Sequence, residues 1–144
     1  MQAEPMTCYI SGPMRGRPRF NFGAFDSCAL YMRRNGWTVF NPAEHDRSLY
    51  PDMEGWDGFA VGDPAQCPTF DLRGALKWDL HRVLETAAII LLPDWEESEG
   101  ACLELQAAKA VGNEVLYSYP VHVDVGVYQD PQWFVSDEYF PVSA

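Results

Sequence analysis

The chain has 144 residues, a length that suits one domain with a single sizeable core. Apolar residues make up 47% of it and charged residues 22%, which is the composition of a folded domain and excludes a disordered tail. The formal net charge of −11 argues against binding to duplex DNA or anionic lipid, because such partners require clustered lysine and arginine. We therefore predict one domain over residues 1–144, and a small-molecule partner remains compatible with this charge.

The cysteines and the apolar runs indicate a cytoplasmic protein. Cys8, Cys28, Cys67 and Cys102 are widely spaced, with no C-x-x-C pair and no histidine at ligand spacing, so we expect free thiols and no metal. The longest apolar run, residues 87–93, is too short to cross a bilayer, and the N-terminus lacks the layout of a signal peptide. We expect no membrane partner.

The first part of the sequence predicts two strands around a helix. Residues 7–12 form an apolar run that ends at a glycine turn, residues 22–35 carry apolar side chains at helical spacing before Gly36, and residues 37–40 are rich in strand formers. From about residue 43 to residue 69, prolines and glycines recur without a sustained period, which predicts a long loop. Such a loop either covers a substrate or is a surface insertion.

The middle of the sequence predicts a helix followed by the central strand of a sheet. A leucine stands at every fourth position, which predicts a helix that ends near Thr86 and packs this stripe on the sheet: Leu72, Leu76, Leu80 and Leu84. Residues 87–93 are then apolar without alternation, as central strands of parallel sheets are.

The following segments complete an α/β pattern. Residues 99–111 are rich in helix formers, with Ser98 placed as the N-cap and Gly112 as the stop, and residues 114–119 predict another strand. Alternating strands and helices predict an α/β fold, a three-layer sandwich with a mostly parallel, Rossmann-like (flavodoxin-like) central sheet. The aromatic tail, residues 120–144, shows neither period and is expected to pack on its own domain or on a partner subunit.

A glycine turn follows the first strand, at the edge where such sheets bind ligands. The segment from Gly12 to Gly16 matches neither the P-loop nor the dinucleotide-binding fingerprint. Its backbone N–H groups and Arg15 either hold one phosphate or form a plain tight turn.

Two acidic residues lie on predicted helices near that edge. Glu104 shares a helix face with Gly100 and Ala108, whose small side chains leave room beside it, so its carboxylate faces either a cleft or solvent. Asp79 lies beside the leucine stripe and, taken alone, reads as a surface acid.

Several short segments, taken in order, resemble one known family. They are Tyr9 to Gly16, Phe20-Asn21-Phe22, Asn41 to Glu44, Asp79-Leu80, and Leu92 to Trp95 followed by Ser98, Gly100 and Glu104. Together they resemble the phage-type DUF4406 branch of the nucleoside 2-deoxyribosyltransferase-like superfamily, over roughly residues 7 to 117. The characterised relatives include deoxyribosyltransferases and 2′-deoxynucleoside 5′-monophosphate N-hydrolases.

The resemblance implies a role for each matching residue. Glu104 would attack the anomeric carbon, Asp79 would protonate the departing base, and Tyr9 would orient the glutamate. Substrate contacts would come from Ser11, Gly12, Arg15, Gly16, Asn21, Ser98 and Gly100. No metal and no cofactor is implied, because a pair of carboxyl groups suffices to cleave a glycosidic bond.

The resemblance also indicates the substrate. Free-nucleoside relatives tend to have an acid where this chain has Ser98, whereas the monophosphate hydrolases have serine, and their matching arginine, here Arg15, contacts phosphate. We expect cleavage of a (2′-deoxy)nucleoside 5′-monophosphate by hydrolysis or deoxyribosyl transfer. The alternatives are a non-catalytic nucleotide-binding module and a structural subunit.

Two further expectations follow from the resemblance and from the long loop. The relatives imply a homodimer or larger homo-oligomer, working in the host cytoplasm if the chain is phage-encoded. Trp56 and Phe59 in the predicted loop either stack on a base or anchor the loop.

Overall fold

The computed structural model describes residues 6–51, 70–121 and 132–141. Its strands form one sheet in the order β2-β1-β3-β4-β5, and the bounds are Thr7–Ser11 (β1), Thr38–Phe40 (β2), Ala88–Leu91 (β3), Glu114–Pro120 (β4) and Trp133–Ser136 (β5). The first four strands are parallel and β5 is antiparallel to β4. The structure thus confirms the mostly parallel α/β sheet and the central place of β3.

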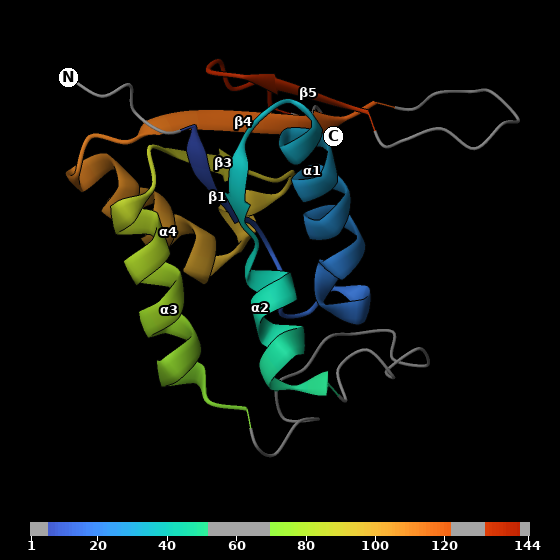
Figure 1. Cartoon of the computed structure of the whole chain (residues 1–144), viewed down its shortest axis with the longest axis vertical. Helices are drawn as coiled ribbons and strands as arrows, with labels where there is room; N and C mark the ends of the chain where they lie inside the picture. Colours follow the sequence, from blue (N-terminus) through green and yellow to red (C-terminus); the bar gives the residue numbers. More distant parts are fainter. Residues whose placement is uncertain (1–5, 52–69, 122–131, 142–144) are drawn as a thin grey trace, which may run out of the picture.

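Helices cover both faces of the sheet, with α3 and α4 on one face and α1 on the other (Figure 1). The helices are Phe22–Arg34 (α1), Pro42–Leu49 (α2), Leu72–Glu85 (α3) and Glu99–Ala110 (α4), with short 3-10 turns at Pro18–Asn21 (η1) and Trp95–Glu97 (η4). Within the described part of the chain, no helix is long and apolar enough to span a bilayer.

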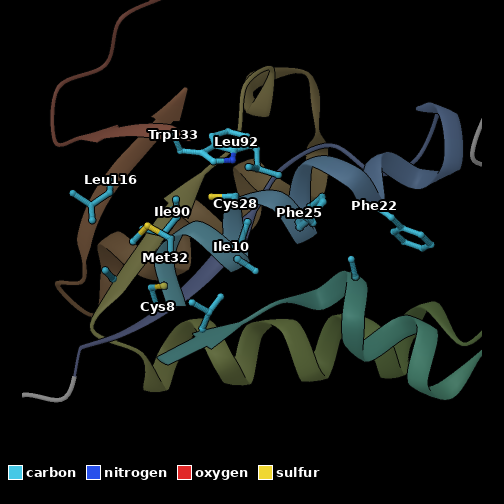
Figure 2. Packing of buried hydrophobic residues seen from close by; sticks show 14 of the residues in the cluster. Cys8, Ile10, Phe22, Phe25, Cys28, Met32, Ile90, Leu92, Leu116 and Trp133 are labelled. Carbon is cyan, nitrogen blue, oxygen red and sulfur yellow. The ribbon is translucent and has the colours of Figure 1, made fainter. Parts of the chain in front are cut away.

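Alternate residues of the inner strands face the two helical layers. Cys8 and Ile10 of β1 pack with Ile90 and α1 in an apolar cluster, shown in Figure 2. Tyr9 of β1 belongs instead to the cluster that faces α3 and α4. Because side chains of a strand alternate between faces, Ser11 lies on the same face as Tyr9.

The loop predicted for residues 43–69 is wrong at its start, where α2 begins. The Oδ1 atom of Asn41 accepts the N–H of Ala43 at 3.0 Å, and Pro42 occupies the first turn, where its missing N–H costs nothing. The Asn-Pro pair that ends β2 therefore also starts a helix, which lies between α1 and α3 (Figure 1). Trp56 and Phe59 lie outside the described residues.

The leucine stripe of α3 is also corrected. Leu72 is 55% exposed and Leu84 51%, and the fully buried residue of the helix is Val83. An α-helix advances about 100° per residue, so every fourth position drifts by about 40° and a long stripe leaves the buried face. The helix itself is confirmed.

The C-terminal tail, whose sequence shows neither helical nor strand periodicity, contains β5. Trp133 is buried against α1, where its indole Nε1 donates to Ser27 Oγ at 2.9 Å, so this part of the tail packs on its own domain. Phe134 and Phe140 remain about half exposed.

Candidate active site

Glu104 is a buried carboxyl group held by two hydroxyl groups of β1. Ser98 caps α4 by accepting the N–H of Ala101 at 3.1 Å, as predicted, which starts the helix with Glu104 on its buried face. Tyr9 donates to Glu104 Oε2 at 2.9 Å and Ser11 donates to Oε1 at 2.6 Å. Glu104 is only 6% exposed, and the hydrogen bonds from β1 fix both of its carboxyl oxygens.

Asp79 of α3 forms the second carboxyl group of the pair. Its Oδ1 atom is buried without a hydrogen-bond donor among the described residues, and the carboxyl groups of Asp79 and Glu104 share a hydrogen bond. Two carboxyl groups can share a hydrogen bond only if one is protonated. The pair therefore holds a proton at its centre.

The surroundings of the pair place this proton on Asp79. Burial raises the pKa of both groups, but hydrogen bonds from Ser11 and Tyr9 stabilise the charged form of Glu104. The pKa of Asp79 is raised by burial and then further by the negative charge of Glu104. Tyr9 stays protonated, because burial and the same charge raise its pKa well above the usual value. The site thus presents a carboxylate beside a carboxylic acid.

Asp46 is a third acid at the site, which the sequence analysis did not identify. It is 7% exposed, its Oδ1 atom is buried without a partner among the described residues, and burial raises its pKa to about 7. Asp46 shares the buried face of α2 with Pro42 and Ala43. The spacing of these three residues fits one face of a helix, but the prolines and glycines of residues 43–69 predict a loop instead.

The carboxyl pair lies where two hollows meet. An outer cleft of about 670 Å³ is lined by Arg15 and by Ser98 and Gly100 at the start of α4. An inner recess of about 140 Å³ is lined mainly by apolar side chains and by Asp46. Both hollows are lined by Arg15, Gly100, Asp79 and Glu104. One ligand can therefore reach a polar end, the carboxyl pair and an apolar end.

The structure places some of the predicted substrate residues in the outer cleft and others away from it. Gly12, like Arg15, Ser98 and Gly100, lines the outer cleft, whereas the hydroxyl of Ser11 is used to hold Glu104. Asn21 and Gly16 line neither hollow. The side-chain amide of Asn21 donates to the Pro13 carbonyl at 3.0 Å and so fixes the loop that carries Arg15.

Two neighbouring loops are joined at the mouth of the cleft. A Cβ atom on Gly12 would lie 2.7 Å from the Cβ of Leu92, so the ends of β1 and β3 approach closely only with glycine there. Arg17 reaches across to Asp94 at 3.1 Å and to Glu97 at 2.8 Å. Arg15 has no such anion partner among the described residues, which leaves its guanidinium available to a ligand.

The described residues contain no group of three histidine, cysteine, aspartate or glutamate side chains placed to hold a metal ion. What they hold is a mostly parallel α/β sheet with a carboxylate and a carboxylic acid above its central strands, a class of site suited to acid-base and nucleophilic chemistry.

Residues 6–117 match the family model described as "Domain of unknown function (DUF4406)", and the chain belongs to this family. The matched range contains Tyr9, Ser11 and the three acids of the site, and it ends within β4, before β5. No curated protein and no solved structure matches the chain.

Proposed function

We propose that the chain cleaves the N-glycosidic bond of a (2′-deoxy)nucleoside 5′-monophosphate. The observation that carries the proposal is the buried Glu104 carboxylate, held on both oxygens by Tyr9 and Ser11 and lying beside the protonated Asp79. Glycosidic cleavage needs both forms at once, a carboxylate at the sugar carbon and an acid at the leaving group. The resemblance to the nucleoside 2-deoxyribosyltransferase-like superfamily, and to its phage-type branch, supports the same reaction.

The proposed reaction has two steps. In the first, Glu104 forms a bond to C1′ as the C1′–N bond breaks, and Asp79 gives its proton to the departing base nitrogen. In the second, water attacks C1′, the Glu104–C1′ bond breaks, and the water proton passes to the Asp79 carboxylate. The products of hydrolysis are the free base and deoxyribose 5-phosphate. A second base in place of water gives deoxyribosyl transfer.

The polar end of the outer cleft supports a phosphate on the substrate. Arg15 supplies a cation, and α4 starts there with Ser98, whose hydroxyl accepts from Ala101 and keeps its own proton to donate. Anions are stabilised at helix N-termini by the aligned peptide dipoles. A monophosphate there would leave the sugar over Glu104.

The same resemblance leads us to propose a homodimer or larger homo-oligomer in the cytoplasm. The half-exposed Phe134 of the edge strand β5, with Phe140, offers apolar surface for an assembly of this kind. Light scattering tests the assembly, and a monomer at working concentration contradicts it.

The test is chromatographic detection of base released from a panel of deoxy- and ribonucleoside monophosphates and nucleosides. We expect wild type to release base from a deoxynucleoside monophosphate and Glu104→Gln to be at least about 1,000-fold slower, because the nucleophile is removed. The matched control is Glu114→Gln, which changes an exposed glutamate at the start of β4 and should keep wild-type activity.

Each result decides between functions. Release that persists in Glu104→Gln contradicts the assigned nucleophile. Absence of release from every compound, with ligands still raising the melting temperature, contradicts the enzyme and favours a nucleotide-binding module. Repeating the assay with a second free base separates hydrolysis from transfer, because only transfer yields a new nucleotide.

A further inference from the structure

The inner recess has the size and lining of a site for one flat ring. Its volume is about 140 Å³, and a protein cavity of about 150 Å³ accepts a benzene-sized ring. Three phenylalanines line it, and the rings of Phe20 and Phe22 stack with centroids 5.6 Å apart. Phe70 is the third. Aromatic faces of this kind favour stacking with another planar ring.

Asp46 is a polar group of this recess, and one of its carboxyl oxygens has no hydrogen-bond partner among the described residues. Its Oδ1 atom is buried and no donor reaches it from the described residues. The adjacent Arg47 side chain is directed elsewhere, to Asp26, at 2.9 Å. A buried acceptor without a donor destabilises the folded protein, and this cost disappears when a ligand supplies an N–H.

The position of Asp46 separates it from the reacting groups. Asp79 and Glu104 line both hollows, whereas Asp46 lines the inner recess and not the outer cleft. Ser98 lines the outer cleft and not the inner recess, so a nucleotide with its phosphate near Ser98 and its C1′ atom at Glu104 would extend its base toward Asp46. Nothing in the two-step reaction requires this third acid, so its burial calls for another role.

We propose that the inner recess is the base subsite and that Asp46 selects bases with an exocyclic amino group beside an unprotonated ring nitrogen, the edge shared by adenine and cytosine. The inference rests on the proposed function for its ligand class. An amino group donates an N–H to the carboxyl oxygen. Above pH 7, where Asp46 is charged, hypoxanthine and uracil would instead turn a carbonyl oxygen toward this acceptor, and two acceptors repel each other.

The test measures binding of four deoxynucleoside monophosphates by calorimetry above pH 7, where Asp46 is charged, in a Glu104→Gln background that prevents cleavage. With Asp46 present, we expect the adenine nucleotide to bind at least about tenfold more tightly than the hypoxanthine one, and the cytosine nucleotide than the uracil one. Adding Asp46→Asn should bring both ratios to within about threefold, because an amide also donates to a carbonyl. Adding Glu44→Gln, on the exposed face of α2, should change neither ratio.

The outcomes separate this inference from the proposed function. Ratios near one with Asp46 present, ratios unchanged by Asp46→Asn, or no binding of any of the four nucleotides would overturn it. The first comparison needs no substitution at Asp46, so poor folding of that variant does not decide the matter. Preferential binding of the adenine and cytosine nucleotides without base release by wild type would contradict only the glycosidase activity. Base release without this binding preference would contradict only the role of Asp46.

Discussion

The two faces of the sheet use neighbouring residues of the same strands for opposite purposes. On the α1 face, Cys8, Ile10 and Ile90 are fully buried in an apolar cluster. On the other face, Tyr9 and Ser11 are buried just as deeply, but they point their hydroxyl groups at Glu104. Equal burial therefore does not mean an equal contribution to stability.

The difference lies in what each face removes from water. The α1 face buries apolar groups, which stabilises the fold by about 25 cal/mol per Å². The α4 face buries acids whose pKa values are all raised by burial: Glu104, Asp79 and Asp46. Desolvation of ionisable groups opposes folding. We infer that the α1 face stabilises the folded state and that burial of the acids on the α4 face destabilises it.

The largest expected effect comes from the apolar face. Ile90→Ala should lower the free energy of unfolding by about 2–5 kcal/mol, because it leaves a cavity at the centre of the sheet. Chemical denaturation measures the change. The control is Leu84→Ala, on the exposed side of α3, where the change should stay within about 0.5 kcal/mol. Equal losses in the two variants would contradict the assignment of the core.

A smaller effect of opposite sign is expected from the acidic face. The pKa of Asp79 is raised to about 8 in the folded chain, so the folded state binds a proton that the unfolded state releases near pH 4. The stability linked to this group is complete below that pH and is lost as the pH rises toward 8. Asp79→Asn should weaken this dependence, because its amide still donates to Glu104 and carries no charge.

Thermal and denaturant unfolding of both proteins at pH 5 and pH 9 measure this effect. At pH 9 the variant should gain at least about 1 kcal/mol over wild type relative to pH 5, the equivalent of roughly one pKa unit. Parallel stability curves for Asp79→Asn and wild type would show that Asp79 is not held protonated in the folded chain.

The smallest expected effect is a difference in thiol reactivity between the two faces of the sheet. Cys8 and Cys28 of the α1 face are buried, and burial raises the pKa of each to about 12, whereas Cys102 of α4 is partly exposed. In a Cys67→Ser background, a disulfide reagent should modify Cys102 in the folded protein and the other two only on unfolding. Rapid reaction of all three thiols without denaturant would contradict the packing of the α1 face.

Most of the fold was predictable from local patterns. The unbroken apolar run at residues 87–93 predicted the central strand, and Ser98 predicted the start of α4. Two of the errors came from segments whose structure depends on distant contacts. Among the described residues β5 pairs with β4 alone, and the buried face of α3 is set by Val83 against the sheet, not by its leucines.

The site was predictable in part, because the resemblance supplied Tyr9, Asp79 and Glu104 and the structure brings them together. The resemblance assigns Ser11 to the substrate, and the sequence alone does not show that its hydroxyl group donates to Glu104. Asp46 was missed because it lies between His45 and Arg47, a polar setting that is typical of a surface residue. Its burial becomes evident only once α2 is known to bury that side.

The alternation along β1 ties assembly of the site to folding itself. A slip of β1 by one residue against β3 would turn Tyr9 and Ser11 into the apolar layer and bring Cys8 and Ile10 under Glu104. Such a chain would lose its core and its carboxylate support in a single event. A correctly folded molecule therefore already holds Glu104 between the hydroxyl groups of Tyr9 and Ser11, and formation of the site needs no step beyond folding.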